Sequence, residues 1–305
     1  MRFTTACNRY AHGCKNDNML HHQSEGYIMF AFYKLLFAGF LTVFSLTAAA
    51  SAVCKIEKQA GFTGIYRGKD LITTSSATKN YVISSFQLNR KTYLESAGFS
   101  CYEKGVKEPC SEANTPAGKC TELRVDARED KIIWKLKYRW RNLAVARTIE
   151  AGKFPGFKLT YDIEVTRDFQ ADRIYLSFRL PKENRYIRTG YLKNGVIQFR
   201  PLKKSEWFGI QRSKDFPYIF FSGDTVKEGV MIMAGDLTSW NRLPNTLLYS
   251  TTAKCYWTVE FIYRFGGMLK KGARHSVSVY VIPIDAGNAA ADAEENFRKL
   301  RNVIQ

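Results

Sequence analysis

Strict two-residue alternation of apolar and polar side chains constrains the fold of this chain more than any other feature. The clearest example is "KIIWKLKYRWRN", residues 131–142. This periodicity is typical of a β-strand with one buried and one exposed face. The apolar register holds Ile132, Trp134, Leu136, Tyr138 and Trp140, and the other holds Lys131, Ile133, Lys135, Lys137, Arg139 and Arg141. The segment therefore predicts a half-buried strand whose outer face carries five cations and no anion.

Strand patterns recur along most of the chain, and only one segment has the pattern of a helix. The Asn194-Gly195 pair predicts a type I′ hairpin turn. The helix is predicted at about 288–304, with Asn288 as its N-cap and an apolar stripe that includes Phe297 and Leu300. The other strand segments are 80–88, 156–168, 172–181, 191–199, 218–235, 256–265 and 274–284. Long strands with one terminal helix predict an all-β fold, a large antiparallel sandwich of two sheets with one C-terminal α-helix.

The N-terminal region has the composition of a targeting segment. Residues 29–52 contain one early lysine, an apolar run and a small-residue site, Ala50-Ser51-Ala52, which is the pattern of a secretory signal peptide. We expect cleavage near Ala52, export to the periplasm or medium, and a single domain over 53–305. Residues 1–28 are expected to be an upstream extension that is not native. A transmembrane anchor and a lipoprotein acylated at Cys54 are the alternatives.

The charge of the chain is strongly positive and belongs to the predicted domain. Residues 1–52 hold four cations and two anions, so +16 of the total net charge of +18 remains on the rest. A basic exported protein meets acidic polysaccharide or an anionic membrane surface more often than nucleic acid, so no nucleic-acid partner is expected. The alternative is that the charge only keeps the protein soluble.

Five cysteines follow the predicted signal peptide, and three of them lie in one turn-rich loop at 101–120. Disulfides are expected in an oxidising compartment. We expect a Cys110–Cys120 bridge, with Cys54 joined to Cys101. The loop contains no histidine and no C-x-x-C pair, so no metal site is expected.

The order of strands and aromatic residues, "WKLKYRW…FPGFKLTYDIEV…DRIYLSFRLP…FGIQRSKDFPYIFFSGD…GVMIMAG", resembles the galactose-mutarotase-like β-supersandwich. The resemblance covers most of 60–285. It implies a fold that recurs in sugar mutarotases and in domains of glycoside hydrolases and polysaccharide lyases. Fold alone does not imply function.

Candidate catalytic residues are few. His275 is the single histidine after residue 52, and its register is shared with valines, which is more typical of a core or rim position. The resemblance implies a histidine acid and a glutamate base, for which Glu164 and Glu260 are the strand glutamates available. Neither matches a family motif. Serine-hydrolase, phosphate-loop and dinucleotide motifs are absent from the sequence, so no cofactor is expected.

Cations interleaved with aromatic residues are the remaining signal, because arginine forks pair with carboxylate, sulfate or phosphate. We therefore expect an exported carbohydrate-binding protein, for an anionic glycan. The alternatives are a polysaccharide lyase, hydrolase or sugar epimerase on the same fold, and a structural envelope protein that contacts anionic lipid or protein. The five cations of one strand face could equally be balanced by neighbouring carboxylates, such as Asp162 and Glu164. The candidate ligand-binding residues are Lys135, Lys137, Arg139, Arg188, Trp207, Arg212, Trp240 and Arg242.

Overall fold

The computed structural model describes residues 54–304 with several gaps. The expected upstream extension and signal peptide lie outside the described residues. No helix in the described part of the chain is long and apolar enough to cross a membrane. The residues outside the description are 1–53, 60–61, 69, 76–80, 89, 115–119, 129, 153, 182–185, 194, 203–206, 211–216, 224–227, 236–244, 252–255, 265–266 and 305.

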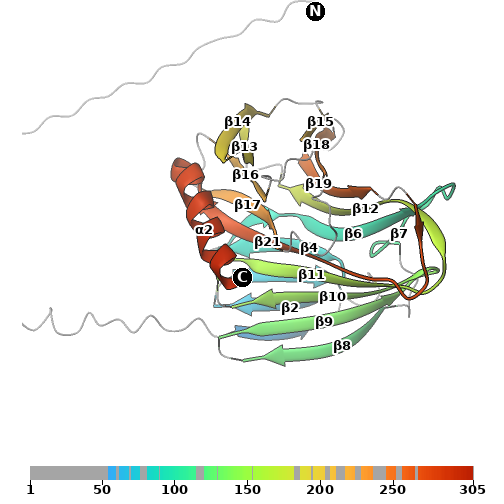
Figure 1. Cartoon of the computed structure of the whole chain (residues 1–305). Helices are drawn as coiled ribbons and strands as arrows, with labels where there is room; N and C mark the ends of the chain where they lie inside the picture. Colours follow the sequence, from blue (N-terminus) through green and yellow to red (C-terminus); the bar gives the residue numbers. More distant parts are fainter. Residues whose placement is uncertain are drawn as a thin grey trace, which may run out of the picture. The chain divides into compact units, whose positions relative to one another are not determined.

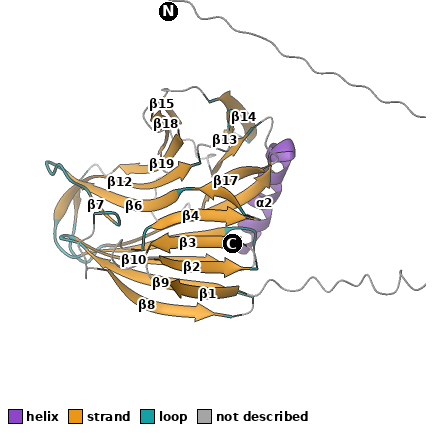
Figure 2. Cartoon of the chain, turned by 180° about the vertical axis from the view of Figure 1, so that it is seen from behind, coloured by secondary structure: helices purple, strands orange, loops and turns teal. Residues whose placement is uncertain are grey.

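The strands form two antiparallel sheets, which Figures 1 and 2 show from opposite sides. The first sheet has twelve strands. Its main path runs β1 (Cys54–Gln59), β2 (Phe62–Arg67), β3 (Asp70–Ser75), β4 (Ile83–Leu88), β6 (Ser96–Glu103), β12 (Phe169–Leu180), β19 (Tyr256–Arg264), β18 (Asn245–Thr251) and β15 (Trp207–Ile210). Three short strands extend it: β5 (Lys91–Leu94) pairs with β4, β7 (Cys110–Ser111) with β6, and β20 (Met268–Leu269) with β12.

The second sheet has nine strands and is followed by the helix. Its order is β14 (Val196–Pro201), β13 (Arg188–Lys193), β16 (Tyr218–Ser222), β17 (Glu228–Ala234), β21 (Arg274–Asp285), β11 (Phe157–Val165), β10 (Leu143–Ala151), β9 (Ile132–Arg139) and β8 (Cys120–Ala127). A 3₁₀ turn (Ala286–Asn288) and α2 (Ala289–Ile304) complete the described chain. The predicted class, an all-β antiparallel sandwich with one C-terminal helix, is confirmed.

Alternation along β9 fills the core between the sheets, as its sequence predicts. The side chains of Ile132, Trp134, Leu136 and Tyr138 are completely buried, and the residues between them are partly exposed. One continuous core joins these side chains to the inward side chains of the first sheet. Burial of apolar surface on this scale is the main force that holds the two sheets together.

Helix α2 covers the outer face of β16, β17 and β21, where Figure 1 shows it lying against these strands. All five residues of β16 are buried, because Ile219 and Phe221 point into the main core while Tyr218 and Phe220 pack beneath the helix. A strand that is covered on both faces is apolar throughout rather than alternating. The continuous apolar sequence of β16 therefore follows from its position between the core and the helix.

The start of the helix differs from the prediction. Asp285 caps the preceding 3₁₀ turn, and its carboxylate accepts a hydrogen bond of 2.9 Å from the amide of Gly287. Asn288, the predicted N-cap, lies inside this turn. The 3₁₀ turn, which continues directly into α2, moves the capping position three residues towards the N-terminus.

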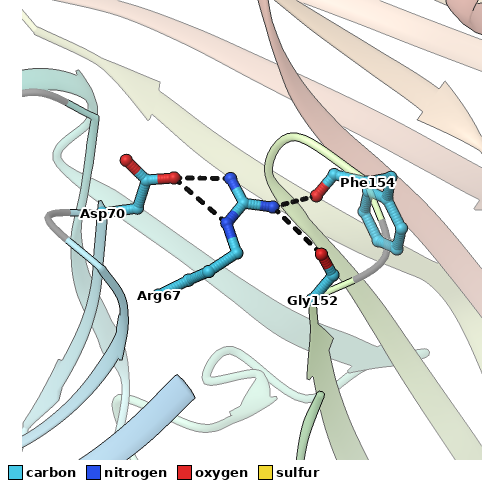
Figure 3. Close-up of polar contacts among 4 residues, drawn as sticks. All are labelled: Arg67, Asp70, Gly152 and Phe154. Carbon is cyan, nitrogen blue, oxygen red and sulfur yellow. Dashed lines mark hydrogen bonds and ion pairs between the residues drawn. The ribbon is translucent and has the colours of Figure 1, made fainter. Parts of the chain in front are cut away.

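Arg67 links the two sheets at one end of the sandwich, as Figure 3 shows. Its Nε donates to Oδ2 of Asp70 over 3.2 Å. Its Nη1 donates to the carbonyl oxygens of Gly152, over 3.4 Å, and of Phe154. Arg67 and Asp70 belong to the first sheet, whereas the two carbonyls belong to the turn between β10 and β11 of the second. Charge-assisted hydrogen bonds of this kind fix the geometry of the turn.

Glu112 forms a second link, in the interior. It follows β7, at the point where β4 and β7 leave a gap beside β6. Its Oε2 accepts from the amide of Phe99 over 3.4 Å and from the Tyr161 hydroxyl over 3.2 Å. Its Oε1 lies 3.3 Å from Nη1 of Arg147, on β10 of the opposite sheet. Burial raises the pKa of Glu112, and Arg147, the amide and the hydroxyl act against that rise.

The cysteines correct the predicted disulfides. Cys101, Cys110 and Cys120 carry free thiols, so neither the Cys110–Cys120 bridge nor the Cys54–Cys101 bridge is formed. Cys110 lies on β7 of the first sheet, directly opposite Cys101, whereas Cys120 begins β8 of the second sheet. Residues that are close in sequence are thus assigned to different sheets. In the described part of the loop, Glu112 accepts hydrogen bonds from Phe99 and Tyr161. Burial raises the pKa of the Cys101 thiol to about 12.

Candidate functional site

The cationic face of β9 lies beside the outward side chains of β10, β11 and β21. The antiparallel pairing aligns these residues in rows across the sheet. One row contains Lys137, Ala146, Asp162 and Ser276. The next row contains Arg139, Ala144, Glu164 and Arg274. Because β10 contributes an alanine to each row, the long side chains of β9 and β11 face each other across a low floor.

This arrangement produces a hollow of about 590 Å³, which we call the alanine-floored hollow. Ala144 and Ala146 form its floor, and Leu123 of β8 adds an apolar wall with 51% of its surface exposed. The charged and polar residues around it are Lys135, Lys137, Asp162, Glu164, Arg274, His275 and Ser276. The structure therefore brings the candidate ligand-binding residues Lys135 and Lys137 close to Glu164, a candidate catalytic residue and one of the expected balancing carboxylates. A few polar groups on an apolar floor are typical of ligand sites.

Asp162 is the main counter-charge of the alanine-floored hollow. Its Oδ2 lies 3.7 Å from Nζ of Lys135, and its Oδ1 accepts a hydrogen bond of 2.9 Å from the hydroxyl of Ser276. Just before β9, Lys131 forms an ion pair of 2.8 Å with Glu150. Carboxylates from β10 and β11 thus balance part of the cationic face. Lys137 borders the hollow and forms no ion pair with any residue that the structure describes.

The three candidate catalytic residues are only partly brought together. His275 lies opposite Ile163, in the apolar register, as predicted, and burial lowers its pKa. It reaches the rim of the alanine-floored hollow, which Glu164 borders from the outward register of β11. Glu260 lies on β19, in the other sheet. Within the described ranges, no group of three or more histidine, cysteine or acidic side chains is arranged to hold a metal ion.

Glu260 shares the outer face of the first sheet with a group that the sequence did not reveal. The rings of Tyr102 and Tyr175 stack with centroids 5.7 Å apart and planes inclined by 24°. The guanidinium of Arg173 lies 4.6 Å from the centroid of Tyr102. Burial raises the pKa of Tyr175, and the nearby Tyr102 and Glu260 add to the rise. We call Tyr102, Arg173 and Tyr175 the tyrosine platform.

The remaining predicted ligand-binding residues lie elsewhere. Arg188, on β13, donates from Nε to the Ser222 hydroxyl over 3.1 Å, and its guanidinium lies 5.4 Å from the Phe199 ring. β13 is six strands from β9 in the order of the second sheet, so Arg188 does not reach the alanine-floored hollow. Trp207 begins β15, but its side chain is outside the description. Three further candidates lie outside the described residues: Arg212, Trp240 and Arg242.

Comparison with known proteins identifies the fold. No protein-family model and no curated protein sequence matches the chain. A Klebsiella pneumoniae protein described as an aldose 1-epimerase is similar with a TM-score of 0.54 and 12% identity, over 79% of this chain and 85% of that one. Galactose 1-epimerase from Lactobacillus acidophilus is similar with a TM-score of 0.53 and 8% identity, over 77% and 100%. The chain therefore has the galactose-mutarotase-like β-supersandwich fold that its strand order predicted.

Proposed function

We propose that the protein binds a carbohydrate in the alanine-floored hollow. The observation that supports this most directly is the meeting of Lys137 and Arg274 with two carboxylates, Asp162 and Glu164, over a low apolar floor. Hydroxyl groups donate and accept hydrogen bonds, so cations and carboxylates together satisfy both roles of a sugar. The floor and Leu123 offer apolar contact to the C–H faces of a ring. Solved proteins of this fold that are described as sugar epimerases support the ligand class.

We infer further that the ligand carries negative charge. The chain after residue 52 has a net charge of +16, and Lys137 has no ion pair among the described residues. A carboxylate or sulfate of the ligand would accept a charge-assisted hydrogen bond from the Lys137 ammonium group. Exposed charge pairs are screened over about 8–10 Å at physiological ionic strength, so the affinity should fall as salt is added.

Replacing Ala146 by phenylalanine is expected to fill the hollow without changing its charge. Calorimetric titration with uronic-acid oligosaccharides should then show an affinity loss of roughly tenfold or more, equivalent to about 1.4 kcal/mol. The matched control is Thr148→Phe, which adds a ring on the same face of β10 but does not border the hollow. Thr148→Phe should leave the affinity close to that of the parent protein, and it should change the free energy of unfolding by about 0.5 kcal/mol or less, as is usual for surface substitutions. Equal binding by both variants would contradict the site.

Sugar chemistry on the outer face of the first sheet is a second candidate function, which the tyrosine platform favours. A phenol and a carboxylate are groups used in general acid–base catalysis, and Tyr175 and Glu260 come from neighbouring strands. In that case, uronic-acid polymers would be cleaved or epimerised, and Tyr175→Phe would remove the activity. A binding protein would retain the polymers and release no product.

We also propose that the protein is exported after cleavage near Ala52. The apolar run of residues 29–52 and its Ala-Ser-Ala end support this. N-terminal sequencing of protein recovered outside the cytoplasm should begin at Val53. A cytosolic protein that begins at Met1 would contradict both export and the exclusion of residues 1–28.

A further inference from the structure

A second hollow lies at the end of β9, between the loop that follows β6 and the turn that precedes β10. Its volume is about 440 Å³. We call it the tryptophan hollow, because Trp140 forms part of its wall. The polar side chains around it include Glu103, Glu108, Asn114, Arg139 and Arg141. The function proposed above does not involve this second hollow.

Trp140 gives the tryptophan hollow a flat wall that the core holds in place. Its ring stacks on Phe99, with centroids 5.3 Å apart and planes inclined by 19°. Phe99 itself is buried. The amide of Trp140 donates to the carbonyl of Leu143 over 2.9 Å, which closes the turn between β9 and β10. A tryptophan ring held in this way is a rigid amphipathic surface, suited to the apolar face of a sugar ring.

The charged groups of the tryptophan hollow are unequally paired. Glu103 Oε2 lies 3.5 Å from Nη2 of Arg141 and accepts a hydrogen bond of 2.9 Å from Nδ2 of the Asn142 side chain. Arg139 is exposed and forms no ion pair with any described residue. Arg139 is therefore the guanidinium available here for an acidic ligand.

Arg139 also connects the two hollows. It borders the tryptophan hollow and lies directly opposite Ala144, which is part of the floor of the other hollow. Lys137 is two residues earlier on the same face of β9. The two positions are about 6.6 Å apart, because each residue advances a strand by about 3.3 Å. Lys137 and Arg139, neither of which forms an ion pair with a described residue, thus stand side by side at the junction of the hollows.

We propose that the tryptophan hollow is a second subsite and that the ligand is an acidic oligosaccharide spanning both hollows. This proposal rests on the proposed function. One sugar occupies the alanine-floored hollow, another stacks on Trp140, and acidic groups between them bind Lys137 and Arg139. A second contact within one ligand raises the overall affinity, because it forms at high effective concentration.

The test is a titration of the protein with a ladder of oligogalacturonates, from the disaccharide upward. Affinity should rise roughly a hundredfold once the chain reaches both hollows. Trp140→Ala and Arg139→Ser should each remove most of this rise, and Trp140→Ala should leave the affinity for the disaccharide unchanged. If Trp140→Ala fails to fold, Arg139→Ser decides the result, since Arg139 is exposed and its side chain forms no hydrogen bond or ion pair with a described residue. Lys193→Ser, an exposed cation on β13, is the matched control and should behave like the parent.

Two outcomes separate failure of the subsite from failure of the proposed function. If Ala146→Phe weakens the disaccharide but chain length and both variants at the tryptophan hollow have no effect, the second subsite is overturned and the proposed function stands. If Ala146→Phe has no effect on any ligand, both are overturned. Retention of the full rise by Arg139→Ser would also exclude the spanning ligand.

Discussion

Replacing Glu112 by alanine is expected to lower the free energy of unfolding by about 3–5 kcal/mol, because it leaves a charged guanidinium alone in the interior. Arg147 is fully buried, and its Nε and Nη2 already have no hydrogen-bond partner among the described residues. Glu112 is the carboxylate paired with it in the described structure. Its loss would also leave the Tyr161 hydroxyl without its acceptor. Urea denaturation followed by tryptophan fluorescence measures the change.

A double variant tests whether the loss comes from the stranded charge. Glu112→Leu with Arg147→Met replaces the ion pair by apolar side chains, which often leaves stability unchanged or raises it by about 1–4 kcal/mol. The double variant should therefore be more stable than Glu112→Ala alone. Removing the exposed pair of Arg298 with Glu294 by Arg298→Ala serves as a control and should cost about 0.5 kcal/mol or less. This account would be contradicted if the double variant lost as much stability as the sum of the losses from the separate changes at Glu112 and Arg147.

The sequence carried a readable signal for one half of this ion pair. In "LAVARTIEA", residues 143–151, Arg147 occupies the register of Leu143, Val145 and Ile149. An arginine in an apolar register predicts a buried charge and hence a buried partner. The partner itself could not be found, because Glu112 lies in a turn-rich loop with no periodicity. Glu112 is buried because it lies at the gap between β4 and β7. This gap exists only once both strands have paired with β6.

The fold was predictable for a similar local reason. Alternation specifies which face of a strand is buried, and the burial of β9 follows it residue by residue. Gly195 also lies where the hairpin turn was expected, between β13 and β14, and has φ +75°. Asn194 lies outside the described residues. Cysteine pairing was not predictable, because sequence spacing does not say to which sheet a strand belongs. Cys110 and Cys120 are close in the sequence but belong to different sheets.

The candidate site was predictable only in part. Alternation placed Lys135, Lys137 and Glu164 on exposed faces but did not say that a single strand separates them. The outward alanines of β10, Ala144 and Ala146, were the signal for a hollow, since small residues on an exposed strand face leave room above it. The tyrosine platform depends on the pairing of β6 with β12, two strands that are far apart in the sequence.

Replacing Gly156 by alanine is expected to lower the free energy of unfolding by about 2–5 kcal/mol, since it combines overpacking, about 1–3 kcal/mol, with backbone strain, about 1–2 kcal/mol. Gly156 has φ +108° and lies at the entry to β11, against β21. A Cβ at this position would overlap the carbonyl oxygen of Val281, a backbone atom that cannot turn aside as a side chain can. Relief of the overlap would require β11 and β21 to separate at the centre of the second sheet. Thermal and urea unfolding measure the loss.

Gly272→Ala separates the two causes. Gly272 also has positive φ, +84°, but nothing lies within 4 Å of the position where its Cβ would stand. Its replacement should therefore cost only the backbone term, about 1–2 kcal/mol. The difference between the two variants measures how firmly β11 and β21 are held together. If the two variants lose the same stability, the strands can move apart at little cost, and the wall of the alanine-floored hollow that residues of β11 and β21 form would not be rigid.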